Sequence, residues 1–375
     1  MATGAVGLFR YRAGSARVST QSTKRSIVAG RTGLLFVLAL VAPARAQTAI
    51  GAQDALHPGG IQAAHILQLW HGTVALCLAV FILVLGACLL ALWRAPRGSR
   101  QSPADLGTLD YTPGTRERRL LRAVGWGAAL SSAGLIVLFA GDILAGRALA
   151  QLPVANALHI ELTGHSWWWE ARYRDPVSNT SFTTANELHL PVGRAAIITL
   201  RSDDVIHSLW VPNLHGKLDL IPGRTTEIRV RADRAGVYRG QCAEFCGLQH
   251  TMMALQVVAE PVAVYAGWAE GQQRPAAAAP ANHIEAQRGA QVFLDNQCAG
   301  CHAIRGTAAR AGIGPDLTHL ASRQTIAAGM LPNARGHLAG WIVDAPSIKP
   351  GVRMPAIKLA PDDLQALLTY LETLH

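Results

Sequence analysis

The chain has 375 residues, of which 50% are hydrophobic and 15% are charged. So much apolar sequence has to be buried that a largely disordered chain is excluded, and the length favours two or three folded units. The formal net charge of +10 is local, because residues 1–46 carry seven Lys and Arg and no acid, and +3 (27 − 24) remains without them. This distribution indicates targeting and membrane orientation, and we expect no nucleic-acid partner.

The amino-terminal segment has the order of a secretory signal. Two cations, Lys24 and Arg25, precede a short apolar run, and small residues up to Ala46 follow it. We predict a signal peptide over residues 1–46 and an outer segment over 47–64. The alternative is a first membrane anchor, but the apolar run is short for a membrane span.

Two longer apolar stretches follow, and neither 66–93 nor 123–141 contains a charged residue. Each is long enough to cross a hydrocarbon core of about 30 Å, so we predict transmembrane helices over 65–93 and 122–145. The loop between them, 94–121, is rich in arginine. The positive-inside rule places this loop in the cytoplasm, so the hairpin spans a lipid bilayer and the rest of the chain faces outward.

Residues 150–265 change to a pattern of short strands. Apolar and polar residues alternate partly or fully at 196–201 and 226–231, and turn sequences such as Pro222-Gly223 separate such segments. Many short strands with turn signals predict an all-β sandwich or barrel.

One loop of this domain combines side chains that bind soft metals. Its donors are Cys242, Cys246, His250 and Met253, and His207 comes 35 residues before the first of them. Thiolate, thioether and imidazole together favour copper over hard cations. A structural zinc site would more often use two Cys-x-x-Cys pairs.

Two thiolates at this spacing can bridge two copper ions, which leaves one imidazole for each ion. Met253 would then cap one copper, and the backbone carbonyl of Glu244 would cap the other. The alternative is a disulfide between Cys242 and Cys246 in an oxidising compartment. Because that alternative leaves His250 unexplained, we favour dinuclear copper.

An Ala/Pro-rich linker over 266–282 leads to a second outer domain over 283–375. Cys298, Cys301 and His302 form the Cys-x-x-Cys-His signature of covalent haem attachment, in which the thiols add to the vinyl groups and the imidazole binds iron. A redox-active dithiol or a structural disulfide is the alternative. A thioredoxin-like site would need a strand and a βα context that the sequence lacks.

Helical patterns at 285–297 and 361–374 predict that this domain is all-α. The haem iron needs a second axial ligand, and the candidates are Met354 and Met330. Met354 lies in a Pro/Gly-rich loop that can present a thioether on a rigid backbone. Met330 follows a sequence that predicts a helix end, so we favour Met354.

Taken together, the motifs resemble cytochrome c oxidase subunit II fused to its own cytochrome c, as in haem–copper oxidases of the c-fused kind. The segments that carry the resemblance are 164–169, 204–212, 217–224, 242–253, 298–302, 314–317 and 349–355. The resemblance implies a two-helix transmembrane hairpin, a cupredoxin-like Greek-key barrel over 150–265 and a class I cytochrome c domain.

The resemblance also implies roles for single residues. The Glu244 carboxylate would help to bind magnesium or manganese at the interface with the catalytic subunit. The Pro315 carbonyl would accept the N–H of the proximal His302. Trp167 would receive electrons above the copper site, whereas we expect Trp168 and Trp169 to serve packing.

The implied function is that of an electron-transfer subunit of an aerobic terminal oxidase in the cell membrane of a bacterium. Electrons would pass from the covalent haem through dinuclear copper to a proton-translocating catalytic subunit that reduces dioxygen to water. The implied partners are oxidase subunit I and other oxidase subunits, with a soluble or membrane cytochrome c as a candidate donor. The alternative is the copper A subunit of a nitric oxide reductase. The full set of copper donors disfavours a quinol oxidase, and the hairpin disfavours a free carrier.

Overall fold

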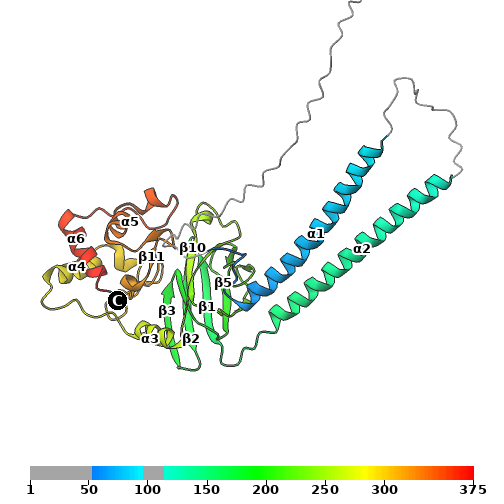
Figure 1. The fold of residues 1–375 in the computed structure, drawn as a ribbon. Helices are drawn as coiled ribbons and strands as arrows, with labels where there is room; N and C mark the ends of the chain where they lie inside the picture. Colours follow the sequence, from blue (N-terminus) through cyan, green and yellow to red (C-terminus); the bar gives the residue numbers. More distant parts are fainter. Residues whose placement is uncertain (1–52, 96–113) are drawn as a thin grey trace, which may run out of the picture. The chain divides into compact units, whose positions relative to one another are not determined.

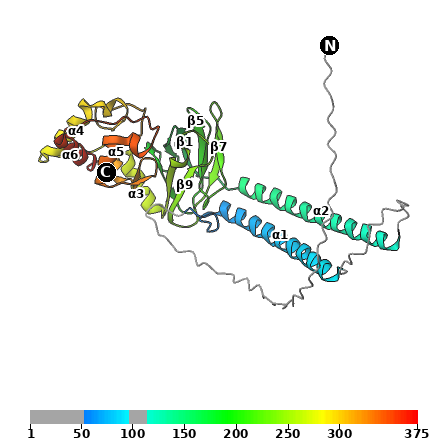
Figure 2. The ribbon, with the colours of Figure 1, turned by 90° about the horizontal axis from the view of Figure 1, so that it is seen from above.

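Two long helices precede the outer domains. The computed structural model describes residues 53–95 and 114–375, so the predicted signal peptide and most of the predicted cytoplasmic loop lie outside the described residues. Helix α1 (Ile61–Arg94) and helix α2 (Thr115–Ala150) run alongside each other in both views (Figures 1 and 2). Their apolar stretches stay exposed, and both helices are long and apolar enough to cross a membrane.

The helices extend beyond the predicted spans at both ends of the hairpin. The added turns of α2 consist mostly of Arg, Leu and Ala, which are strong helix formers, so the helix continues past the apolar stretch. The first turn of α1 is anchored on the outer domain. Its buried Gln62 donates to the carbonyl of Arg229 at 3.1 Å and accepts from the N–H of Arg231 at 3.3 Å.

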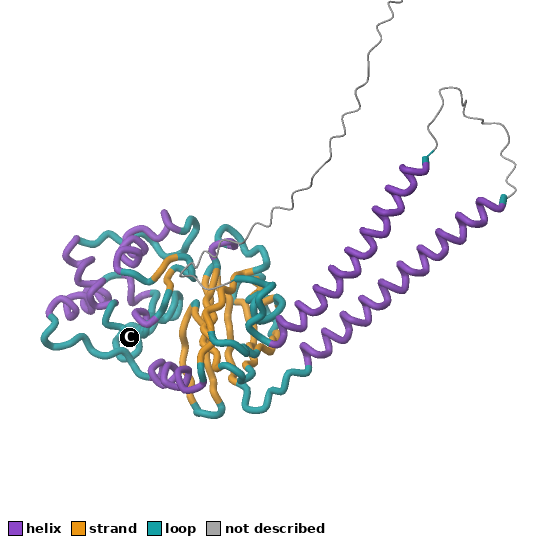
Figure 3. The backbone as a smooth tube through the Cα atoms, viewed as in Figure 1, coloured by secondary structure: helices purple, strands orange, loops and turns teal. Residues whose placement is uncertain are grey.

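The first outer domain, here called the β-sandwich domain, consists of two five-stranded sheets (Figure 3). One sheet has the order β3-β2-β1-β5-β8 and the other β4-β10-β9-β6-β7. The strands are β1 (Leu158–His165), β2 (Trp168–Asp175), β3 (Thr180–Ala185), β4 (Glu187–Pro191), β5 (Ala196–Ser202), β6 (His207–Trp210), β7 (Leu218–Leu220), β8 (Thr226–Val230), β9 (Gly236–Cys242) and β10 (Ala254–Glu260). The predicted all-β, cupredoxin-like fold is thereby confirmed.

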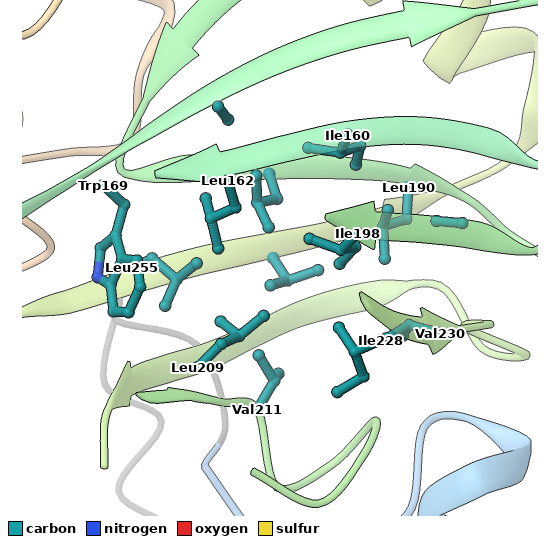
Figure 4. Close-up of a cluster of buried hydrophobic side chains, with 14 of the residues drawn as sticks. Ile160, Leu162, Trp169, Leu190, Ile198, Leu209, Val211, Ile228, Val230 and Leu255 are labelled. Atoms are coloured by element: carbon teal, nitrogen blue, oxygen red, sulfur yellow. The ribbon is translucent and has the colours of Figure 1, made fainter. Parts of the chain in front are cut away.

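The core of the sandwich lies between the two sheets. Alternate residues of β2 are buried, as expected when one face of a strand contacts the core. Side chains from both sheets, such as Leu162 of β1 and Leu209 of β6, fill the space between the strands (Figure 4). Trp169 is fully buried in this cluster, as predicted for a packing residue.

A helix occupies part of the segment that was predicted to be a linker. Helix α3 (Val262–Gln273) overlaps the first half of 266–282, so the predicted linker begins too early. Tyr265 and Ala269 are buried against the sandwich, and Trp268 packs on the same core. This burial favours a helix where composition alone suggested an extended chain. The residues that follow also contact protein, since Ala276 packs on the next domain.

The second outer domain, here called the helical domain, contains α4 (Ile284–Asp295), α5 (Arg335–Ile348) and α6 (Pro361–Leu371). The helices predicted near 285–297 and 361–374 are therefore present, with somewhat earlier ends. A two-stranded sheet, β11 (Thr325–Ile326) and β12 (Leu331–Pro332), adds to them. Buried side chains of α4 and α6 form the centre of the core.

The predicted helix end before Met330 is wrong. Residues 327–329 instead form a turn between β11 and β12, with positive φ values of 54° at Ala327, 56° at Ala328 and 75° at Gly329. An L-residue in the left-handed region costs roughly 1–2 kcal/mol. Local sequence preference for helix is therefore overridden here by contacts made elsewhere in the protein.

Gly289 allows α4 and α6 to cross closely. A Cβ at this position would lie 1.9 Å from the carbonyl oxygen of Ala366, so the helices would have to separate. We expect Gly289→Ala to destabilise the helical domain by about 1–3 kcal/mol, as overpacking usually does. Hydrogen exchange of the α4 and α6 amides measures this loss. The control is Gly336→Ala in α5, because a Cβ there meets nothing within 4 Å. Equal protection in the two variants would contradict the prediction.

Candidate copper and haem centres

Two thiols and two imidazoles converge at one end of the β-sandwich domain. The Sγ atoms of Cys242 and Cys246 lie 3.6 Å apart and form no disulfide. Each thiol faces one imidazole, with 3.9 Å from Cys242 Sγ to His207 Nδ1 and 3.8 Å from Cys246 Sγ to His250 Nδ1. The structure thus brings the predicted donors together as two thiol–imidazole pairs.

Strand pairing explains how distant residues reach one site. His207 is the first residue of β6 and Cys242 is the last residue of β9, and these two strands pair antiparallel. The loop from β9 to β10 carries Cys246 and His250, and it ends at the fully buried Met253. Close packing fixes the first imidazole further, since a Cβ on Gly164 would lie 2.8 Å from Cδ2 of His207.

Asp204 orients His207 from the side opposite the thiols. Its carboxylate lies 2.9 Å from Nε2 of His207 and accepts from the N–H of Ser166 at 2.7 Å. Burial opposes ionisation of Asp204, but hydrogen bonds from Ser166 and His207 outweigh it and lower the pKa of the carboxyl to about 2. A carboxylate behind a metal-binding imidazole fixes the ring and its tautomer. Asp204 therefore acts inward, on the imidazole of His207.

The two thiols do not ionise equally. The hydrogen bond from Cys246 lowers the pKa of the Cys242 thiol, and the same contact together with burial raises the pKa of Cys246. Burial alone would lower the pKa of His207, but hydrogen bonds with Cys242 and Asp204 raise it. The lowered pKa favours the thiolate form of Cys242 beside the imidazole of His207. This donor set fits soft metal ions, which bind thiolate and imidazole.

Glu244 presents two different groups. Its carbonyl oxygen lies 3.2 Å from Sγ of Cys242, on the side of the thiols. Its carboxylate is half-exposed and pairs with Lys217 at 3.0 Å. The carbonyl therefore belongs to the thiol cluster, whereas the carboxylate points to the surface, where a second metal site would have to be shared with another chain.

A cavity of about 240 Å³ lies in the helical domain beside the Cys-x-x-Cys-His motif. Cys298, Cys301, His302 and Met354 all line it, and Met330 does not. Nδ1 of His302 lies 2.8 Å from the carbonyl oxygen of Pro315, so Nε2 is the nitrogen free to bind a metal. A Cβ on Gly314 would lie 2.7 Å from Cε1 of His302, so the backbone packs directly on this ring.

A partly buried arginine in the cavity wall has a buried donor that fits a haem carboxylate. Arg323 lines the cavity, and its Nε has no hydrogen-bond partner within the described chain. An unpaired buried donor is costly. A haem carries two carboxylates, and either of them would satisfy this guanidinium. The two thiols, the free Nε2 of His302 and the Met354 thioether complete a donor set that fits a covalent haem.

Residues of the β-sandwich domain line the same cavity. They are His165, Ser166, Trp167, Trp168 and Asn186. The indole Nε1 of Trp167 donates to the carbonyl of Cys246 at 2.7 Å. The ring rests on Gly247, whose φ of +107° and whose missing Cβ both favour glycine. Trp167 therefore connects the cavity wall with the backbone of a thiol residue.

Trp168 also differs from its prediction as a packing residue. It lines the cavity and stacks on His165, with ring centroids 4.3 Å apart and planes 11° apart. Sequence reasoning missed this role, and that of His165, because β2 begins at Trp168 and a strand start gives no sign of which face a distant domain will cover. A His before three consecutive Trp residues was the available signal.

A buried Glu–His–Glu cluster lies in the β-sandwich domain, where this domain contacts the helical domain. His189 is 2.9 Å from Glu187 through Nε2 and 2.9 Å from Glu260 through Nδ1. Burial would lower the pKa of His189, but its hydrogen bonds with both glutamates raise it. The second oxygen of Glu187 accepts from the N–H of Gln324 in the helical domain at 3.1 Å.

We expect the unfolding free energy of the β-sandwich domain to fall as pH rises through the raised pKa of His189. A group whose pKa is higher in the folded than in the unfolded state contributes fully below the unfolded value, about 6.5 for imidazole, and loses its contribution above the folded value. Denaturation from about pH 6 to about pH 9 measures this slope. His189→Gln keeps hydrogen-bonding capacity without titrating, so an unchanged slope in that variant would contradict the prediction.

Two family models match the chain. Residues 176–260 match "Cytochrome C oxidase subunit II, periplasmic domain", and residues 286–375 match "Cytochrome c". The chain thus has one region similar to a subunit II periplasmic domain and a second region similar to cytochrome c. The β-sandwich domain is called the subunit II domain from here on, and the helical domain is called the cytochrome c domain.

The relatives agree with this assignment. Cytochrome c oxidase subunit 2 of Alkalihalophilus pseudofirmus is 40% identical over 220 residues, which are 58% of this chain and 62% of that protein. The corresponding protein of Bacillus subtilis is 29% identical over 229 residues, 58% of this chain and 63% of that protein. The chain thus spans less than two thirds of these relatives' lengths.

A solved periplasmic domain is also similar to part of the chain. It belongs to subunit II of the cytochrome oxidase of Bradyrhizobium japonicum and is 29% identical, covering 32% of this chain and 96% of that chain with a TM-score of 0.29. All the proposed copper donors lie inside the subunit II match, and the Cys-x-x-Cys-His motif and Met354 lie inside the cytochrome c match. Trp167 and Trp168 lie outside both matches.

Proposed function

We propose that this chain is the electron-transfer subunit of an aerobic terminal oxidase, carrying electrons from a covalent c-type haem through dinuclear copper to a catalytic subunit that reduces dioxygen to water. One observation carries the proposal: the cavity lined by Cys298, Cys301 and His302 is also lined by Trp167, which donates to the carbonyl of Cys246. A single side chain thus connects the two donor sets.

The residues of the chain have separate tasks in this function. Cys298 and Cys301 attach the haem, and His302 and Met354 hold its iron. The copper ions are held by His207, Cys242, Cys246, His250 and Met253 together with the Glu244 carbonyl. When bound, these groups supply one-electron carriers, and the protein limits the reorganisation that accompanies each transfer by holding buried, hydrogen-bonded ligands in place.

The proposal also includes partners. In this proposal the chain lies in the lipid bilayer of a bacterial cell membrane, beside oxidase subunit I and other oxidase subunits. The two long, exposed apolar helices support the membrane position. The half-exposed Glu244 carboxylate is available to a magnesium or manganese ion shared with subunit I. A soluble or membrane cytochrome c would supply electrons to the haem.

Purification of the complex with its partner subunits tests the proposal. We expect two copper ions and one covalent haem per copy of this chain, a mixed-valence signal shared over both coppers, and oxygen consumption driven by reduced cytochrome c. A four-line signal from a single copper in the fully loaded chain would contradict dinuclear copper. Consumption of nitric oxide in place of oxygen would assign the chain to a nitric oxide reductase.

A further inference from the structure

We propose that Gln249 is a positioning residue that holds the cytochrome c domain on the subunit II domain in one orientation for electron transfer. This inference rests on the proposed function, because it concerns the same pair of redox sites. Gln249 directly precedes His250, the imidazole that faces Cys246. Its side chain is fully buried.

The amide of Gln249 bonds to the loop that carries Met354. Its Nε2 donates to the carbonyl oxygens of Lys349 and Pro350, each at 3.1 Å. The two carbonyl acceptors fix the orientation of the Gln249 amide, because its oxygen would be repelled by both carbonyl oxygens if the amide were turned over. One side chain therefore connects the loop beside a proposed copper ligand with the loop beside a proposed haem ligand.

A second set of contacts involves the strained turn of the cytochrome c domain. The carbonyl of Ala328 accepts from the N–H of Ala254 at 3.0 Å, and the carbonyl of Gly329 accepts from Arg239 at 3.2 Å. Ala254 is the first residue after Met253, so this contact also starts next to a proposed copper ligand. A turn with two left-handed alanines persists only where its surroundings hold it.

Lys349 joins the two haem-side elements into one surface. Its buried ammonium donates to the carbonyl of Ala327 at 3.1 Å, while its own carbonyl accepts from Gln249. Shape adds to this pairing. The backbone at Gly351, whose φ is +89°, packs closely against Leu248. A Cβ added to Gly351 would lie only 3.0 Å from Cδ1 of Leu248. Hydrogen-bond donors of the subunit II domain thus bind carbonyl groups of two loops of the cytochrome c domain. Because Lys349 connects these loops, the two domains fit together in one orientation.

These contacts set the position of the haem site relative to the copper site. Electron tunnelling falls steeply with the distance between two centres, so a tethered domain that swings away transfers slowly until it returns. The net contribution of one hydrogen bond to the free energy of docking is modest. The loss of two buried hydrogen bonds nevertheless shifts the docking equilibrium roughly tenfold or more. Gln249 therefore controls how often the haem site lies against Trp167.

The test uses the full chain in its complex, with copper and haem loaded, and follows flash-induced reduction of copper by haem. We expect Gln249→Ala to slow this transfer roughly tenfold or more and to make the rate depend on solvent viscosity, as for a step limited by domain motion. The copper signal and the haem spectrum should stay unchanged. Amide exchange at Ala254 and Gln324 should rise, because their N–H groups are bonded across the contact.

Two further variants keep the outcome clear. Arg239→Ala removes one contact to the turn without touching the copper loop, and it should slow transfer in the same way by a smaller factor. Gln62→Ala is the matched control, because it removes two hydrogen bonds of an equally buried Gln where α1 meets the sandwich. It should leave the transfer rate unchanged.

Three results would overturn the inference. One is a wild-type rate in Gln249→Ala with both centres occupied. Another is a slowed rate accompanied by an altered copper signal, which would mean that Gln249 acts on His250. The third is an equal slowing in Gln62→Ala. A wild-type chain that binds both groups yet moves no electron between them would contradict the proposed function itself, and this result is distinguishable from the other three.

Discussion

Replacement of Trp167 by Ala should slow electron transfer from haem to copper roughly tenfold or more, the equivalent of at least about 1.4 kcal/mol of added barrier. The indole forms part of the wall of the haem cavity and donates to the carbonyl of Cys246 at 2.7 Å. Removing the indole ring leaves a gap between the haem cavity and the backbone of Cys246, which Trp167 connects. Flash-induced reduction of copper by haem in the intact complex measures the rate.

Trp167→Phe separates the ring from the hydrogen bond. It keeps an aromatic ring at the cavity wall but loses the bond to Cys246, so its rate should lie between those of the wild type and Trp167→Ala. Trp268→Phe is the control, because Trp268 stacks on His189 at 3.9 Å and does not line the cavity. An unchanged rate in Trp167→Ala, with both centres fully occupied, would mean that electrons reach copper elsewhere.

Met354→Ala should abolish the sulfur-to-iron charge-transfer band at the red end of the haem spectrum. Met354 lines the cavity together with His302, and its flanking loop is held by Gln249 and Lys349. Loss of the thioether leaves one axial position without its protein ligand, so complete loss of the band is expected, whereas the copper signal should persist.

Met330→Ala is the matched comparison for this prediction. Met330 does not line the cavity and follows the turn between β11 and β12. We expect the band to remain at full intensity in this variant. Loss of the band in Met330→Ala and its retention in Met354→Ala would reverse the assignment of the axial ligand.

The chemistry of both sites could be predicted from the sequence because most of the donors are close together along the chain. Cys242, Cys246, His250 and Met253 lie in one loop, and Cys298, Cys301 and His302 form one short motif. Spacing within a short segment limits which metal or cofactor it can hold. The apolar stretches of the hairpin were also predictable, since a run long enough to cross a bilayer is a local property.

The relations between distant segments could not be predicted in this way. The carboxylate of Asp204 turned out to orient His207, and Trp168 turned out to line the haem cavity. Ala327 and Ala328 belong to a residue type with high helix propensity, yet they adopt a left-handed turn whose carbonyls are bonded by Lys349 and by the subunit II domain. Tertiary contacts outweigh a propensity difference of less than about 1 kcal/mol per residue.

The sequence alone determined which side chains can hold copper and haem, and which segments can enter a membrane, because residue type and short-range spacing specify both. Only the tertiary structure decided how the two sites are joined. The bonds from Gln249 to Lys349 and Pro350 connect residues about one hundred positions apart, and the cavity is closed by residues of two domains. Such contacts depend on how separately folded surfaces fit together, and no local pattern along the chain encodes that fit.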